Sequence, residues 1–411
     1  MVNTNRGAGI AREATASNGL ESQADALACV GKLLEGIRQR ADDTDKNRRV
    51  AQETVDELLD SGLFSVVTPK IFGGADLGFA TLIKVTAEIA SVCGSSGWVY
   101  GVLAGHSWLL NLFPLEAQQE TLGKPGTLTA TIFRLGGSVV PVDGGYRLRD
   151  GEGRFCSGID FADWIIVGNT VQLPNGEKEP RFFVLPSSDV EVIDDWHTVG
   201  MRGTGSRSVR IREAFIPEHR SVALSDMIGG SSPGADYHEA PIFRMPFSDV
   251  APFSIVGAPI GMALGAIKLY VDDMTGRLAN ADDLMLANSG AALNRLAVAQ
   301  SEIEAGLQLV IADAETVDGI LDPTELTALD RARLPRNWAF AVQKARASTN
   351  HIFEIAGGSG IYNYSKIQRF WRDVNSSAQH FAFGQDSAMI NFGRTMVGKS
   401  PDMFALKKRK R

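Results

Sequence analysis

A change of hydrophobic periodicity, which happens twice along the chain, restricts the fold more than any single motif. From about Glu21 to Leu122, apolar residues recur at the spacing of amphipathic helices. From about Thr127 to Val222, short β-branched and aromatic runs alternate with turn sequences such as DGG, a pattern typical of strands and hairpins. Helical spacing returns from about Phe247 to Met403. The pattern predicts an α+β chain whose β domain lies between two helical regions.

Both ends of the chain differ from the regions between them. The first twenty residues are polar and lack the apolar core of a secretory signal, so we interpret them as a disordered tail. The C-terminal run KKRKR is interpreted as a solvated tail, with binding to an anionic surface as the alternative. The expected segments are a disordered tail over 1–20, an N-terminal helical domain over 21–122, a central β domain over 123–235, a C-terminal helical bundle over 236–400 and a basic tail over 401–411.

Composition excludes several classes of partner. The net charge of −7 gives no electrostatic basis for binding nucleic acid. Cys29, Cys93 and Cys156 show no CxxC spacing, and no His, Asp or Glu set has metal-ligand spacing, so we expect no disulfide framework and no metal. Three unpaired cysteines suit a reducing, cytoplasmic setting. The longest apolar run, Ala251 to Ile267, is interrupted by prolines and makes a poor membrane span, so no membrane partner is expected.

Three glycines in the third region are spaced four residues apart. Gly257, Gly261 and Gly265 share one face of the predicted helix, where the missing side chains let another backbone approach closely. We interpret them as a packing device and assign them no part in catalysis.

Three strings resemble a known fold family, in the order and spacing that the family has. FEIAGGSGIYNYSKIQRFWRD (Phe353 to Asp373) resembles the glycine-rich turn and R-x-x-R-D ending of the C-terminal bundle in the acyl-CoA dehydrogenase superfamily. HTVGMRGTGSRSVRIREAFIPEHR (His197 to Arg220) resembles the exit of its β domain. RFCSG (Arg154 to Gly158) falls where the superfamily places an aromatic-x-Thr/Ser segment against a flavin ring. The resemblance implies an N-terminal helical domain, a central β-barrel or sandwich and a C-terminal four-helix bundle.

The resemblance separates two branches of that superfamily. The dehydrogenases need a carboxylate base, which most of them carry in a Tyr-Glu pair shortly after the R-D. Here that pair falls on His380 and Phe381, and a phenylalanine cannot act as a base. By contrast, SSGWVYGVLAGHSWLLNLFPLEAQQE, GMRGTGS and RDVNSSAQH resemble the group D flavin monooxygenases. These are the oxygenase components of two-component systems, such as 4-hydroxyphenylacetate 3-hydroxylase and the phenol- and indole-type hydroxylases.

The resemblance to the monooxygenases implies site residues. His106, His380 and Ser157 would be catalytic, with Ser157 at flavin N5. The implied cofactor contacts are Phe155, Ser157, Arg277, Gly357 and Gly358, and the implied substrate pocket comprises Trp98, Tyr100, His106, Trp108 and Phe381. Each has a structural alternative. A buried histidine is commonly satisfied by a backbone carbonyl, Ser157 can cap a turn, Arg277 can be a solvated charge, and the aromatic residues can belong to the core.

The implied chemistry uses reduced flavin, FADH2 or FMNH2, which reacts with O2 at C4a to give a hydroperoxide. A dry pocket slows the wasteful loss of hydrogen peroxide, and small residues from Gly101 to Gly105 would let ring and substrate approach. A histidine can be base or donor, and the sequence leaves open which histidine has which role. No GxGxxG follows a strand and no Walker loop is present. We therefore expect a separate NAD(P)H:flavin reductase that supplies reduced flavin by diffusion.

The sequence thus predicts the oxygenase component of a flavin-dependent monooxygenase, a homotetramer that hydroxylates a small aromatic substrate of the phenol or indole type. The alternatives are an N- or S-oxygenating member of the same family and an acyl-CoA dehydrogenase or oxidase. A non-enzymatic flavin-binding protein that has kept only the fold is a third.

Overall fold

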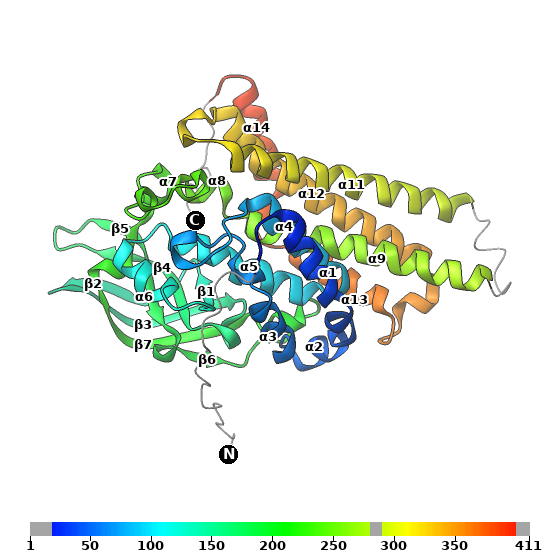
Figure 1. The fold of residues 1–411 in the computed structure, drawn as a ribbon, viewed down its shortest axis with the longest axis horizontal. Helices are drawn as coiled ribbons and strands as arrows, with labels where there is room; N and C mark the ends of the chain where they lie inside the picture. Colours follow the sequence, from blue (N-terminus) through cyan, green and yellow to red (C-terminus); the bar gives the residue numbers. More distant parts are fainter. Residues whose placement is uncertain (1–18, 280–289, 400–411) are drawn as a thin grey trace, which may run out of the picture.

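The computed structural model describes residues 19–279 and 290–399, and every structural statement below refers to these residues. The expected tails, 1–20 and 401–411, fall outside this part except for residues 19 and 20. A β domain lies on one side of the molecule and a set of long helices on the other, with α5 between them (Figure 1). The predicted order of a helical region, a β domain and a second helical region is confirmed.

The N-terminal helices build the centre of the molecule. Apolar α4 and α5 are buried along almost their whole length, whereas α1 and α3 are amphipathic and bury one face. The helices of this region are α1 (Gln23–Gln39), α2 (Ala41–Asn47), α3 (Gln52–Asp60), α4 (Gly78–Val92), α5 (Gly94–Leu110) and α6 (Leu115–Leu122).

An eight-stranded sheet forms the β domain and has a core of its own, separate from the larger helical core. The order is β6-β7-β3-β2-β4-β5-β8, and β1 pairs with β4 outside this path. The pairings are antiparallel except β1 with β4 and the single-residue link of β2 with β4. The strands are β1 (Thr129–Ile132), β2 (Ser138–Val142), β3 (Gly145–Cys156), β4 (Trp164–Gln172), β5 (Lys178–Pro186), β6 (Glu191–Ile193), β7 (Arg207–Pro217) and β8 (Ser221–Ala223).

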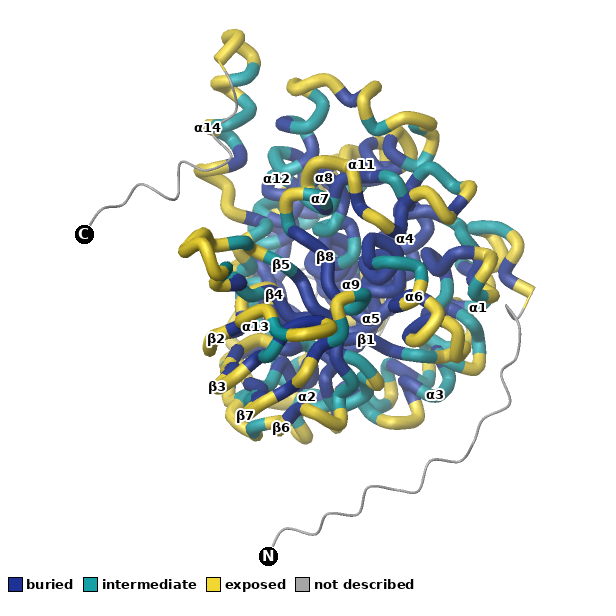
Figure 2. Tube along the Cα trace, turned by 90° about the vertical axis from the view of Figure 1, so that its left-hand side faces the viewer, coloured by how far each residue is buried: buried dark blue, intermediate teal, exposed yellow. Residues whose placement is uncertain are grey.

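The C-terminal region contains the longest helices. They are α7 (Leu224–Gly229), α8 (Phe247–Val250), α9 (Phe253–Ala279), α11 (Gly290–Gly319), α12 (Ala328–Ile355), α13 (Lys366–Ser377) and α14 (Gln385–Met396). Figure 2 shows α14 projecting from the body of the molecule with much of its surface exposed. A helix rarely stays exposed on so many sides, so α14 is a candidate surface for contact with another subunit.

Helix α9 confirms the packing prediction for its three glycines. A Cβ on Gly257, Gly261 or Gly265 would lie within 2.6 Å of a backbone carbonyl oxygen of α4. The helix continues through Pro259, as the shared face of the three glycines requires. Residues 247–276 are long and apolar enough for a membrane span, but 78% of the relevant window is buried inside the protein. We therefore describe α9 as the central core helix. Its burial against α4 and α5 offsets the backbone hydrogen bond that Pro259 cannot donate.

Candidate active site

Helix α5 carries four of the predicted site residues, Trp98, Tyr100, His106 and Trp108, and packs closely through its glycines. A Cβ on Gly101 would lie 2.1 Å from the Ser254 carbonyl oxygen, and one on Gly105 would lie 2.4 Å from the Ser254 Cβ. These glycines therefore face α9. The expectation that small residues from Gly101 to Gly105 make room for flavin and substrate is wrong, because α9 fills that space.

His106 is held in one tautomer by a strand of the β domain. It is 7% exposed, and its Nδ1 lies 2.7 Å from the carbonyl oxygen of Thr129, with the Thr131 hydroxyl at 3.2 Å. A carbonyl only accepts, so Nδ1 carries the proton and Nε2 presents a lone pair. Burial lowers the pKa of His106 to about 4, although the Thr129 hydrogen bond opposes this shift. The ring is therefore neutral at pH 7, with Nε2 as an acceptor.

His380 is held in the opposite tautomer. It directly precedes the short turn of 3-10 helix at Phe381–Phe383, and its Nδ1 accepts a hydrogen bond of 3.3 Å from the backbone N–H of Ala382. The proton must then reside on Nε2, which becomes a donor. Burial also lowers the pKa of His380 to about 4, so this ring is neutral as well. The two histidines thus offer one acceptor and one donor.

Ser157 lies at the end of β3 and joins the helix α5 to the β domain. The indole Nε1 of Trp98 donates to its hydroxyl at 3.2 Å, and its hydroxyl lies 2.7 Å from that of Ser206. The Trp98 ring meets the His380 ring edge to face, with centroids 5.6 Å apart. The structure therefore brings Trp98, Ser157 and His380 together from three separate segments of the chain.

Aromatic contacts connect this group to the strand that holds His106. The Phe381 ring lies 4.5 Å from that of His380 and 6.1 Å from that of Phe133, centroid to centroid. Phe133 directly follows β1, whose Thr129 and Thr131 bind His106. Phe381 is 74% exposed despite these contacts. We define the site group as Trp98, His106, Ser157, His380 and Phe381. Contacts through β1 and α5 connect its members.

The R-x-x-R-D ending predicted for α13 places His380. Arg372 binds Asp45 of α2 at 3.2 Å, and the carboxylate of buried Asp373 accepts a 2.6 Å hydrogen bond from the backbone N–H of Met201. Burial raises the pKa of Asp373 to about 6, although the Met201 N–H opposes this shift. A Cβ on Gly200 would lie 2.3 Å from the Arg372 carbonyl oxygen. These contacts fix the segment after β6 against α13, which ends three residues before His380.

Phe155 and Trp196 form an aromatic edge beside Ser157. Their ring centroids are 5.8 Å apart at an interplanar angle of 84°. Phe155 is 69% exposed and has a positive φ of 68°, which is uncommon for a bulky residue and found where a site constrains the backbone. The sequence prediction did not include Trp196. Its only signal was its position directly before the HTVGMRGTGS string.

Two predicted pocket residues are buried in the helical core. Tyr100 is fully buried, donates to the Leu63 carbonyl at 3.0 Å and packs on Phe64, and burial raises the pKa of its phenol. Trp108 donates to the Ile242 carbonyl at 2.7 Å and packs on Phe79. The polar atoms of both side chains thus bind backbone carbonyls, and their part in the substrate pocket stays a prediction.

Two predicted cofactor contacts, Gly357 and Gly358, lie on the turn that follows α12. Both are exposed at the start of this turn, and α13 separates them from His380. Arg277 lies near the end of α9, and its side chain falls outside the described part of the chain.

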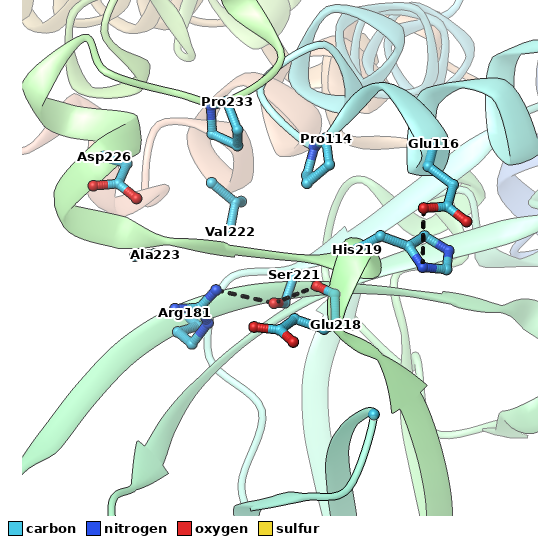
Figure 3. Close-up of a pocket in the computed structure, with 11 residues that line it drawn as sticks. Pro114, Glu116, Arg181, Glu218, His219, Ser221, Val222, Ala223, Asp226 and Pro233 are labelled. Carbon is cyan, nitrogen blue, oxygen red and sulfur yellow. Dashed lines mark hydrogen bonds and ion pairs between the residues drawn. The ribbon is translucent and has the colours of Figure 1, made fainter.

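One surface hollow is lined by none of the site-group residues. It measures about 540 Å³ and is open, and Arg181, Ser221, Glu218 and His219 line it beside Pro114 (Figure 3). His219 there binds Glu120 at 3.1 Å, and Arg181 binds Ser221 at 3.0 Å. None of the predicted site residues contributes to this hollow, so we give it no part in the proposed chemistry.

The residues of the site group, together with neighbouring Phe155, fit a flavin. A flavin ring needs flat apolar contacts and hydrogen bonds at its nitrogen edge. Phe155 and Phe381 offer uncovered aromatic rings, and half-buried Ser157 offers a hydroxyl beside them. Among the described residues, no group of three or more His, Cys, Asp or Glu could hold a metal ion.

Comparisons with known proteins agree with this arrangement. Residues 30–125 match the family described as acyl-CoA dehydrogenase, N-terminal domain, and residues 253–385 match acyl-CoA dehydrogenase, C-terminal domain. The crystal structure of the HsaA monooxygenase from M. tuberculosis has a TM-score of 0.86 at 34% identity and covers 92% of this chain and 98% of that one. XiaF from Streptomyces sp., in complex with FADH2 and glycerol, has a TM-score of 0.84 at 26% identity, with 92% and 96% covered. The protein therefore has the acyl-CoA dehydrogenase fold.

Curated relatives specify the branch. The oxygenase subunit HsaA of a flavin-dependent monooxygenase from Mycobacterium tuberculosis is 34% identical over 91% of this chain and 96% of its own. The oxygenase component of an FADH2-dependent resorcinol hydroxylase from Rhizobium sp. is 30% identical over 90% and 94%. The chain belongs to this family, the oxygenase components of flavin-dependent monooxygenases. The dehydrogenase alternative is not favoured, as the replacement of the base by Phe381 predicted.

Proposed function

We propose that the protein hydroxylates a small aromatic substrate bearing a hydrogen-bond donor, a phenol or an indole, with reduced FAD or FMN and O2. The reduced flavin, when bound, supplies two electrons, so that one oxygen atom enters the substrate and the other leaves as water. The observation that carries the proposal is the pair of opposite tautomers at His106 and His380.

Each histidine has a role that follows from its tautomer. His106 Nε2 accepts the hydrogen bond of a phenol O–H or an indole N–H, which raises electron density on the ring carbon to be oxidised. His380 Nε2–H donates to the oxygen that leaves, next to the Trp98 ring. A thioether has no proton to give to His106, so the arrangement favours hydroxylation over S-oxygenation.

The site group encloses the reaction by keeping water out. Trp98 and His106 are buried, and Phe133 and Phe381 are in ring contact where the group approaches the surface. Aromatic and apolar walls reduce the loss of oxygen as hydrogen peroxide. Ser157 is proposed to contact flavin N5, and Phe155 the ring face.

Arg277, Gly357 and Gly358 are proposed to contact the flavin of a neighbouring copy in a homotetramer. Support comes from the exposed apolar side chains on α14 and on the turn after α12, including Ile390, Met396 and Tyr364. A patch of this kind is usually covered by a partner. We also propose a cytoplasmic location, with reduced flavin diffusing from a separate NAD(P)H:flavin reductase. The three free cysteines of this chain support it.

A substrate panel with chemically reduced flavin tests the proposal. Phenols and indoles should give hydroxylated product under air, whereas matched aryl thioethers and O-methylated phenols should give hydrogen peroxide only. Equal turnover of a phenol and its methyl ether would contradict the role of His106 as an acceptor.

A further inference from the structure

Five residues beside the proposed flavin site form one continuous hydrogen-bonded chain. Trp98 Nε1 lies 3.2 Å from the Ser157 hydroxyl, and that hydroxyl lies 2.7 Å from the Ser206 hydroxyl. The Ser206 hydroxyl lies 2.7 Å from the Thr204 hydroxyl, which lies 2.9 Å from the Met201 carbonyl oxygen. The chain thus contains four contacts, one indole N–H and three hydroxyl protons.

The two ends of this chain determine the direction of every proton in it. The indole N–H of Trp98 can only donate, and the Met201 carbonyl can only accept. Thr204 must therefore use its proton on Met201, Ser206 must donate to Thr204, and Ser157 must donate to Ser206. Any other order leaves one of the four contacts without a proton.

Burial makes this order costly to reverse. Trp98, Thr204 and Ser206 are 7%, 3% and 4% exposed, so water cannot replace a lost partner. The accepting end is also fixed in place, because the backbone N–H of Met201 binds Asp373 at 2.6 Å and Trp196 Nε1 donates to the Met201 carbonyl at 3.0 Å. Of the three hydroxyls, only that of Ser157 is partly exposed.

Ser157 is consequently left with one free lone pair and no free proton. The indole occupies one lone pair of its oxygen, and its proton points to Ser206. A partner on the exposed side of Ser157 must therefore donate to it. Reduced flavin has an N5–H that can donate, whereas N5 of oxidised flavin has only a lone pair.

We infer that Ser206 and Thr204 are positioning residues that make Ser157 an obligate acceptor and thereby select reduced over oxidised flavin. The inference rests on the proposed function, in which Ser157 contacts flavin N5. Oxidised flavin can bind well only if Ser157 turns its proton outward, which makes Ser206 and Thr204 turn with it and removes the Thr204 hydroxyl proton from the buried Met201 carbonyl. Ser157 has no free proton to donate to N5, so it can only accept the hydrogen bond from the N5–H of reduced flavin. This acceptor holds the N5 proton in place.

Flavin affinity in both redox states tests the inference without turnover. The wild-type protein is titrated anaerobically with oxidised and with chemically reduced FAD and FMN, and the ratio of the two dissociation constants is compared with that of Ser206→Ala. Removing the Ser206 hydroxyl frees the Ser157 proton for oxidised N5. The preference for reduced flavin should fall about tenfold, mainly through tighter binding of the oxidised form. The midpoint potential of the bound flavin should drop by about 30 mV.

A matched pair of variants at Thr204 tests whether the effect is purely structural. Thr204→Val keeps the shape and removes the hydroxyl, so Ser206 can turn to donate to Ser157 and the preference should fall as in Ser206→Ala. Thr204→Ser keeps the hydroxyl and should retain the wild-type preference. A structural role would instead weaken both redox forms equally and lower the Tm.

The outcomes separate this inference from the proposed function. A wild-type protein that prefers reduced flavin, with Ser206→Ala and Thr204→Val unchanged within about twofold, overturns the inference and leaves the function standing. Equal weakening of both redox forms also overturns it. A wild-type protein that binds neither flavin removes the proposed function and the inference with it.

Discussion

Replacing His106 by two different amides separates its structural hydrogen bond from its proposed chemistry. His106→Asn keeps an amide N–H near the position of Nδ1, where it can still donate to the Thr129 carbonyl, and removes Nε2. His106→Gln extends an amide to the position of Nε2 and gives up the bond to Thr129. The native Nδ1 bond is 2.7 Å long and the side chain is 7% exposed, so both effects are large enough to measure.

The expected magnitudes follow from burial. Loss of the donor leaves the Thr129 carbonyl unpaired, which costs about 1–3 kcal/mol of unfolding free energy in His106→Gln. His106→Asn retains that bond and leaves a small cavity, which costs about 1 kcal/mol. Product formation should show the reverse order, with about a 100-fold loss in His106→Asn, the usual scale for removing a general base. Flavin oxidation should continue in this variant and yield hydrogen peroxide.

The assay is the ratio of hydroxylated product to hydrogen peroxide, measured beside the Tm of each variant. The account requires His106→Asn to be the more stable and the less coupled of the two. If His106→Asn remained fully coupled while His106→Gln lost both stability and product, His106 would be a core residue held by Thr129 and nothing more.

Three further predictions concern packing, pH and the branch of the family. Gly261→Ala places a Cβ 2.1 Å from the Ala87 carbonyl oxygen and should lower the unfolding free energy by about 3 kcal/mol, whereas Gly31→Ala, with no atom within 4 Å, should raise it slightly; denaturant melts compare them. Burial lowers the pKa values of His106 and His380 to about 4, so both rings are neutral well below pH 6.5. The value of kcat/KM should therefore stay level from pH 8 to about 5.5 before it falls. An acid limb of the pH profile centred near 6.5, lost in His106→Asn, would contradict this. Acyl-CoA thioesters should not bleach bound oxidised flavin, because Phe381 occupies the position of the base, and the absorbance of a mixed sample reports the result.

Features with a local sequence signature could be predicted. The four-residue spacing of Gly257, Gly261 and Gly265 implies a close helix contact wherever the helix packs, and α4 supplies the partner. His380 was found because the R-D motif seven residues before it marks a position in the family. In both cases the information lies within one helix or one short string.

Features that depend on long-range contacts could not be predicted. Helix α5 is buried on all sides, so Trp98, Tyr100 and Trp108 look alike in sequence, and only the packing shows that Trp98 alone reaches Ser157. The tautomers of His106 and His380 depend on Thr129 and Ala382, and the proton order at Ser157 depends on hydroxyls about fifty residues away. No periodicity encodes these contacts, because they form only when the segments pack together.

The central claim is that this chain alone inserts an oxygen atom when it receives reduced flavin from outside. The most direct test mixes the purified protein with chemically reduced FAD, isotopically labelled O2 and a phenol, with no reductase and no nicotinamide. We expect a hydroxylated phenol that carries one labelled oxygen atom. Complete recovery of the label as hydrogen peroxide, with the phenol and an indole both unchanged, would contradict it.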